Sequence, residues 1–263
     1  MTDPGLFRLR GPCLAIGLLA AIAAAGCHAA EASQDRTQPA LIVAYHTTPT
    51  HWLAFRKALR SEELPYLQAL QQQGVLRGYH LLFNRQLDSS GWNAMAIITF
   101  NGAAGLARWT RGASTMPGGL TQDELALTSR IESTPARLVR RGMARKAAAS
   151  PVTLAIPYRY KVSEDAYVKY LDGYTIPQLQ GWIDAGVLAR YTIFLAQYPA
   201  GRPWSAMLVL DYRSDAALAA RDGVKARVRA RLAGNPAWKA ISDDKKSVRD
   251  ELAPTLADDA GGR

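Results

Sequence analysis

The chain contains an internal duplication. Residues 74–107 align without a gap with residues 186–219, at an offset of 112, and ten of the 34 positions are identical. The identical pairs include Gly74/Gly186, Tyr79/Tyr191, Trp92/Trp204 and Met95/Met207. Repetition at a fixed spacing indicates that one structural unit occurs twice. We therefore predict two units, residues 40–142 and 152–258, joined by a linker at 143–151.

In each copy the hydrophobic pattern changes period in the same order: strand, helix, two strands, helix, strand. The first helix carries a proline in its middle, a Thr or Ser at its expected N-cap and a glycine just past its end. These residues are Thr50, Pro65 and Gly74 in the first copy, and Ser163, Pro177 and Gly186 in the second. The strands are expected at residues 40–46, 75–85, 92–100 and 130–140, and again at 154–160, 187–197, 204–212 and 248–256.

This order, βαββαβ, is the ferredoxin-like plan. Pro135 and Pro254 fall in the last strand of each copy, which predicts that these strands lie at sheet edges. The third strand of each copy carries Met, Ile or Val on both faces, and helices can cover only one face of such a sheet. The predicted fold class is therefore α+β, with two tandem ferredoxin-like units whose bare faces cover each other.

The duplication and the element order resemble the dimeric α+β barrel superfamily, which includes the antibiotic-biosynthesis monooxygenase, EthD-like and NIPSNAP-like families. The resemblance implies a barrel formed by two ferredoxin-like units, here as a pseudo-dimer within one chain. The chain is also similar to tandem exported bacterial proteins of unassigned function. That second likeness rests on Pro-Ala-Trp at 236–238 and on Lys-Lys-x-Val-Arg within 245–249.

The first 26 residues have the pattern of an export signal. Arg8 and Arg10 form a basic start, and residues 13–26 are uncharged and apolar. This stretch is shorter than the roughly 20 residues that span a membrane. Residues 27–39 are small and polar, as in a tether. We expect the protein on the periplasmic side of a bacterial membrane.

The end of the signal predicts a lipid anchor. The sequence Ala-Ala-Ala-Gly-Cys at residues 23–27 resembles the lipobox of bacterial lipoproteins, in which the cysteine is acylated. Cys27 is the only cysteine outside the apolar stretch, so no disulfide competes for it. The alternative is ordinary signal-peptidase cleavage after Ala29 or Ala30, which would leave a soluble periplasmic protein.

The candidate site residues belong to the first copy. His80 and His46 are the candidate general bases, and the expected ligand-binding residues are Tyr45, Arg77, Gly78, Tyr79 and Asn84. His80 is expected to share a strand face with Leu76, Gly78 and Leu82, and the missing side chain of Gly78 leaves room for a ligand. The alternative is that each histidine only forms a hydrogen bond with a neighbouring residue or faces solvent.

Composition restricts the partners and cofactors. The net charge of +10 suits an anionic partner, yet export argues against nucleic acid. Basic residues within 221–231 interleave with apolar ones, which predicts an amphipathic helix with a solvated or envelope-facing basic side. Some barrel relatives bind haem through a histidine, which would suit His51, but no acidic residue joins it to His46. We expect neither metal nor cofactor.

Three functions remain open from the sequence. The leading one is a small-molecule binding or accessory module of the envelope, with a small apolar or aromatic ligand inside the barrel. The second is the activity that the resemblance implies, a cofactor-independent monooxygenase or isomerase. The third is a structural or interaction lipoprotein with a filled barrel.

Overall fold

The computed structural model describes residues 38–262 apart from 88–90, 147 and 149–150. The predicted export signal, Cys27 and all but the last two residues of the predicted tether lie outside the described residues. Within the described part, no helix is both long enough and apolar enough to cross a membrane.

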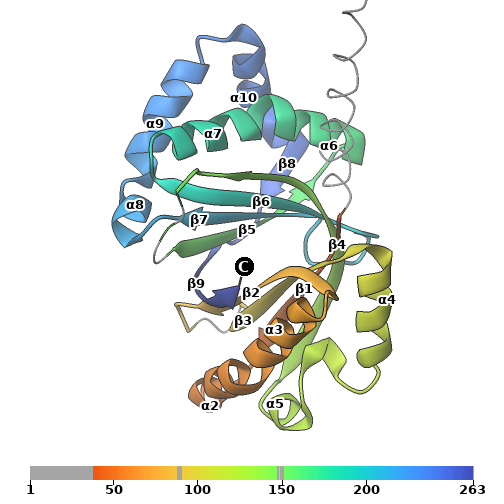
Figure 1. Cartoon of the computed structure of the whole chain (residues 1–263). Helices are drawn as coiled ribbons and strands as arrows, with labels where there is room; N and C mark the ends of the chain where they lie inside the picture. The colour runs from red at the N-terminus through yellow and green to blue at the C-terminus, as the bar shows by residue number, and fades with distance from the viewer. Residues whose placement is uncertain (1–37, 88–90, 147, 149–150, 263) are drawn as a thin grey trace, which may run out of the picture. The chain divides into compact units, whose positions relative to one another are not determined.

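The first half, and the second half as far as its last helices, follow the element order expected from the sequence (Figure 1). The first half contains β1 (Gln38–His46), α2 (Trp52–Ala58), η2 (Leu59–Glu63), α3 (Leu64–Gln72), β2 (Leu76–Asn84), β3 (Ala94–Phe100), α4 (Gly102–Gly112), η3 (Pro117–Gly119), α5 (Gln122–Ala126) and β4 (Arg130–Met143). The second half contains β5 (Val152–Tyr160), α6 (Glu164–Tyr170), η4 (Leu171–Thr175), α7 (Ile176–Asp184), β6 (Leu188–Ala196), β7 (Ala206–Tyr212), α8 (Asp215–Ala219), α9 (Arg221–Leu232), α10 (Pro236–Val248), β8 (Arg249–Glu251) and β9 (Thr255–Gly262).

Eight of these strands close into an antiparallel barrel. The first half contributes the order β4-β1-β3-β2 and the second half β9-β5-β7-β6. The barrel closes because β2 pairs with β9 and β4 pairs with β6, so no edge of either half stays open inside the ring. The short β8 pairs with β5 outside this ring. The predicted α+β barrel is thus confirmed.

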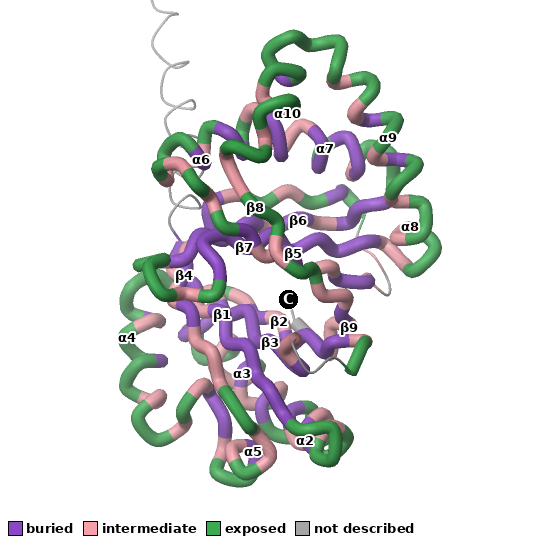
Figure 2. The backbone as a smooth tube through the Cα atoms, turned by 180° about the vertical axis from the view of Figure 1, so that it is seen from behind, coloured by how far each residue is buried: buried purple, intermediate pink, exposed green. Residues whose placement is uncertain are grey.

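The buried residues lie mostly along the strands (Figure 2). The apolar ones among them form one core inside the barrel and two outside it. The inner core draws on both halves and includes Ile42, Leu82, Met95, Ile97, Leu138, Phe194, Trp204, Met207 and Val209. Trp92 packs against the same core, so the matched tryptophans Trp92 and Trp204 both serve packing, as predicted. The outer cores lie between the strands and the helices of each half.

The long helix after the first strand has the same irregularity in both halves. A π-helical turn, η2 or η4, precedes Pro65 and Pro177, which occupy the second positions of α3 and α7. Proline has no N–H for the carbonyl four residues earlier, and the wider turn accommodates that loss. The predicted terminal glycines, Gly74 and Gly186, follow with φ of +71° and +76°.

Two local predictions need correction. Ser163 caps α6 as predicted, but the N-cap of α2 is His51 rather than Thr50, and it makes no side-chain cap bond. Pro135 does not lie at a sheet edge, because β4 is flanked by β1 and β6. The Pro135 carbonyl accepts from the N–H of Gln197, the residue after the end of β6. The backbone N–H that proline lacks would point to the same side, where β6 has already ended, so the sheet loses little by its absence.

The C-terminal strand also differs from the prediction. The segment 248–256 was expected to be one strand, whereas α10 continues to Val248 and Pro254 lies between β8 and β9. β9 extends through Asp258 and Asp259, which belong to a residue type that is rare in strands. Pairing with β2 on one side and β5 on the other provides the hydrogen bonds that override this preference.

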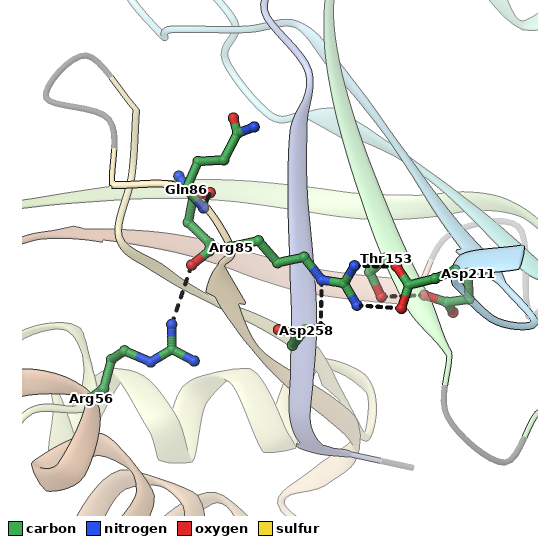
Figure 3. A network of polar contacts seen from close by, with 8 residues as sticks. Arg56, Arg85, Gln86, Thr153, Asp211 and Asp258 are labelled. Atoms are coloured by element: carbon green, nitrogen blue, oxygen red, sulfur yellow. Dashed lines mark hydrogen bonds and ion pairs between the residues drawn. The ribbon is translucent and has the colours of Figure 1, made fainter. Parts of the chain in front are cut away.

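A polar contact joins the two halves where β2 meets β9. The Nε of Arg85, the residue after β2, donates to Asp258 Oδ1 of β9 at 2.7 Å (Figure 3). The same guanidinium pairs with Asp215 at the start of α8. Both acids belong to the second half, so Arg85 connects the halves at the seam that closes the barrel.

Candidate functional site

A cavity of about 180 Å³ opens at the end of the barrel where β1 begins. Its floor is apolar and is formed by Ile97, Leu138, Phe194 and Val209. Its walls are polar and come from both halves: Gln38, Arg77, His80, Thr99, Arg141, Arg190, Thr192 and Asp211. An apolar floor with a few convergent polar groups is the usual construction of a small-molecule site.

His80 is held by a carboxylate from the other half. Its Nδ1 lies 2.7 Å from Asp259 Oδ2 on β9. Burial alone would raise the pKa of Asp259, but the bond and charge of His80, the Gly261 N–H and Arg190 together hold that pKa below its usual value. A carboxylate at Nδ1 fixes the imidazole tautomer and leaves Nε2 as the nitrogen that can accept a proton.

Arg190 is positioned by a second buried carboxylate. Its Nε donates to Asp211 Oδ2 at 2.6 Å, and the Thr153 hydroxyl donates to Asp211 Oδ1 at 2.7 Å. Asp211 is only 4% exposed, whereas the Arg190 side chain is 30% exposed, so a buried carboxylate holds a guanidinium that reaches solvent. Arg190 is therefore fixed in one orientation beside the cavity rather than free in solvent.

Two β-bulges explain why these side chains reach the cavity. The register shifts between Leu76 and Gly78 in β2, and at the matching position between Leu188 and Arg190 in β6. Bulges at a barrel rim redirect side chains. The first half places Gly78, which has no side chain, where the second half places Arg190, and both residues border the cavity. The bulge also moves Leu76 to the outer core, so Leu76 does not share a face with His80 as predicted.

The predicted site residues divide into two groups. Arg77, Gly78, Tyr79 and His80 border the cavity, although the Tyr79 ring also packs in the outer core. The others lie elsewhere. Tyr45 is buried in the outer core and donates to the Gly118 carbonyl at 2.6 Å. Asn84 is buried at the far end of β2, where its amide donates to the Trp92 carbonyl.

His46 lies at the opposite end of the barrel from the cavity. Its ring is 3.4 Å from Glu132 Oε2 and 3.2 Å from an Arg130 nitrogen. Burial, and then the charge of Arg130, lower the pKa of His46, which favours a neutral ring. The two candidate bases are thus not brought together, and His46 has its own local partners.

The residues present do not fit a haem. His51 is exposed at the start of α2, outside the barrel. His80 borders a cavity smaller than the roughly 300–1,000 Å³ of sites for drug-sized ligands, so a porphyrin does not fit there. In the described residues, no group of three or more His, Cys, Asp or Glu side chains could hold a metal ion.

The sequence reasoning missed the second half's share of the site. Arg190, Asp211 and Asp259 are not among the predicted site residues. One signal was available: Asp211 interrupts the apolar strand Leu-Val-Leu-Asp-Tyr, and an acid there requires a partner. The bulge that pairs Arg190 with Asp211 leaves no such trace in the sequence.

A second ionisable cluster lies outside the barrel. Glu63 of η2 is 1% exposed, neither of its carboxyl oxygens has a hydrogen-bond partner among the described residues, and a Cβ on Gly119 would lie 2.9 Å from its Oε1. Burial and the nearby Glu124 raise the pKa of Glu63 well above its usual value. Glu63 is too enclosed to contact a ligand, so we expect its ionisation to affect the stability of the fold.

Comparison with known proteins supports the fold. No family model matches the sequence, and no curated protein matches it. The chain is similar to the solved structure of an anthrone oxidase-like protein, with a TM-score of 0.55, 10% identity, and coverage of 88% of this chain and 94% of that one. It is also similar to a variant of the chlorite dismutase from Candidatus Nitrospira defluvii, with a TM-score of 0.51, 6% identity, and coverage of 88% and 94%. At such identities the likeness shows the dimeric α+β barrel fold alone.

Proposed function

We propose that this chain binds a small organic anion in the barrel cavity. The observation that carries the proposal is the gathering of Arg77, Arg141 and Arg190 around an apolar floor. The apolar floor suits the aromatic body expected from the sequence, and the arginines add a requirement for a carboxylate or phenolate group on it. The two halves act here as tandem ferredoxin-like units that each supply part of one site.

A second candidate function is favoured by the pair of His80 and Asp259. An oriented imidazole next to arginines can remove a proton from an acidic O–H or C–H and leave the resulting anion stabilised by the guanidinium groups. This is the chemistry that a cofactor-independent oxygenase or isomerase requires of its protein. In this function His80 is the catalytic residue and Asp259 its positioning residue.

The binding proposal is tested with hydroxynaphthoate as a fluorescent aromatic acid. Arg190→Gln should weaken its binding at least tenfold, because a charge-assisted hydrogen bond is lost, worth about 1.5–3 kcal/mol. His80→Ala should weaken binding as well. With phenylpyruvate, an aromatic acid whose acidic proton is on carbon and therefore exchanges slowly without a catalyst, it should abolish any base-catalysed exchange of that proton. Fluorescence titration measures the first effect and deuterium exchange the second.

The control is Arg159→Gln, the same charge change at an exposed position of β5. It should leave the dissociation constant within twofold of the unmodified protein. Equal weakening by Arg159→Gln would mean that net charge, and not the cavity, attracts the acid. If the unmodified protein binds the acid but catalyses no proton exchange, the binding function is supported and the enzymatic function is rejected.

We also propose that the protein is an exported accessory module held at a membrane by a lipid on Cys27. The support is the signal pattern and lipobox-like sequence of residues 1–27. Cys27→Ser should abolish incorporation of a fatty-acid label and move the protein from the membrane fraction to the soluble fraction. Unlabelled, soluble unmodified protein would instead support ordinary cleavage near Ala29 or Ala30.

A further inference from the structure

A second cavity, of about 50 Å³, lies on the other face of the sheet from the barrel cavity, between the strands of the second half and the helices α7 and α9. Its sheet side is formed by Ile156, Leu208 and Leu210, which belong to the outer core. Its other walls carry Gln178 and Trp182 from α7, Arg221, Lys225 and Arg229 from α9, and Arg249 and Glu251 from β8. We call this cavity the α9 pocket.

The charge around the α9 pocket is strongly positive. Four cationic side chains line it, and among its lining residues the only carboxylate is Glu251, whose Oε2 accepts from the Tyr158 hydroxyl at 3.1 Å. Lys225 is half-buried, and both its burial and the charges of Arg229 and Arg221 lower its pKa. Cations that repel one another at a cavity are an arrangement that a bound anion would stabilise.

Buried donors without partners lie beside these charges. Trp182 Nε1 and Arg249 Nη1 are both buried and have no hydrogen-bond partner among the described residues. Buried donors are normally paired, so each of these requires a ligand or an ordered water. Two of the arginine side chains at the pocket are held in place by the protein itself. Arg229 Nε donates to Gln178 Oε1 at 2.8 Å, and the Arg249 guanidinium, whose Nη1 lacks a partner among the described residues, lies 3.8 Å from the centre of the Tyr158 ring.

We propose that the α9 pocket binds a tetrahedral oxyanion of the phosphate class. A volume of about 50 Å³ holds roughly three or four waters, which is the scale of one such ion rather than of an organic molecule. Its oxygens would accept from the indole N–H of Trp182, from Arg249 and from Lys225. In this proposal the basic face of α9 binds a specific ligand, whereas the sequence alone predicts only a solvated or envelope-facing surface.

The test is calorimetric titration of the full chain with inorganic phosphate at constant ionic strength. The unmodified protein should bind phosphate saturably at this site. Lys225→Gln should weaken binding at least about tenfold, and Trp182→Phe, which keeps an aromatic ring but removes the N–H together with the five-membered ring of the indole, should weaken it severalfold. Phosphate should raise the unfolding temperature of the unmodified protein and not that of Lys225→Gln, which also shows whether the variant is folded.

Two controls locate the site. Arg227→Gln changes an exposed charge on the same helix, and Arg190→Gln changes the barrel cavity on the other face of the sheet. Both should bind phosphate as the unmodified protein does. The proposal is overturned if the unmodified protein shows no saturable binding, if Arg227→Gln weakens it as much as Lys225→Gln, or if Arg190→Gln abolishes it while Lys225→Gln does not. Glycerol 3-phosphate in the same titration then distinguishes a free ion from the phosphate end of a larger molecule.

Discussion

Residues 38–145 expressed alone should not remain a soluble monomer. In the whole chain, β2 of this half pairs with β9 and β4 pairs with β6, so the fragment has two unpaired strand edges. It also exposes its share of the inner core, including Ile42, Met95 and Ile97, each at most 2% exposed in the whole chain. Fully burying one such side chain contributes roughly 1.5–3 kcal/mol. Open edges and an apolar face together drive association.

We expect the fragment to form a homodimer, in which a second copy supplies the missing half-barrel, or to precipitate. Sedimentation velocity measures which of these occurs. Co-expression with residues 151–263 is the matched control, and should give a soluble one-to-one complex because both edges and the inner face are then covered. A fragment that sediments as a stable monomer at micromolar concentration would show that the halves do not depend on each other.

The sequence predicts the barrel well because the duplication shows that one structural unit occurs twice. The matched glycines at 74 and 186 and the prolines at 65 and 177 specify the same helix twice. The apolar character of both faces of β3 and β7 requires a second cover for the sheet. These are properties of periodicity and turn chemistry, which are local in the sequence. Edge pairing between β2 and β9 could not be derived this way, because the residues of β9 have little intrinsic preference for strands.

The candidate site was predictable only in its first-half part. Gly78 and His80 stand out because the second copy has larger or less polar counterparts, and both border the cavity. Asp259 lies 179 residues from His80, and only the register of β9 brings them together. The sequence predicts His46 in the same interior, yet it lies at the end of β1 that is far from the cavity. A period-two pattern gives the face of a strand residue but not its depth along the barrel.

The buried Glu63 should make the protein less stable as pH rises, and Glu63→Gln should remove most of that dependence. Its pKa is raised in the folded state by burial, and then by Glu124, relative to the ordinary value of 4.5. The folded state therefore keeps a proton that the unfolded state releases. The stability associated with this proton is fully present below pH 4.5 and is lost as pH rises through the raised pKa.

The neutral amide of Glu63→Gln resembles the protonated acid and cannot ionise. We therefore expect about equal stability of variant and unmodified protein near pH 4.5, and a relative gain for the variant of roughly 1.4 kcal/mol for each pH unit between the ordinary value and the raised pKa of Glu63. Urea unfolding at a series of pH values measures both. Glu124 is unsuitable for the same test, because its carboxylate accepts from the Thr121 N–H at 2.8 Å and caps α5.

Asp123→Asn is the matched control, since it neutralises an exposed acid next to Glu124. It should leave the pH dependence of the free energy of unfolding as it is in the unmodified protein. If Glu63→Gln and Asp123→Asn behave alike, the decline in stability with pH comes from the general charge of the protein. If the decline disappears only with Glu63→Gln, it comes from the enclosed carboxyl group of Glu63 beside Gly119, whose oxygens have no donor within the described part of the chain.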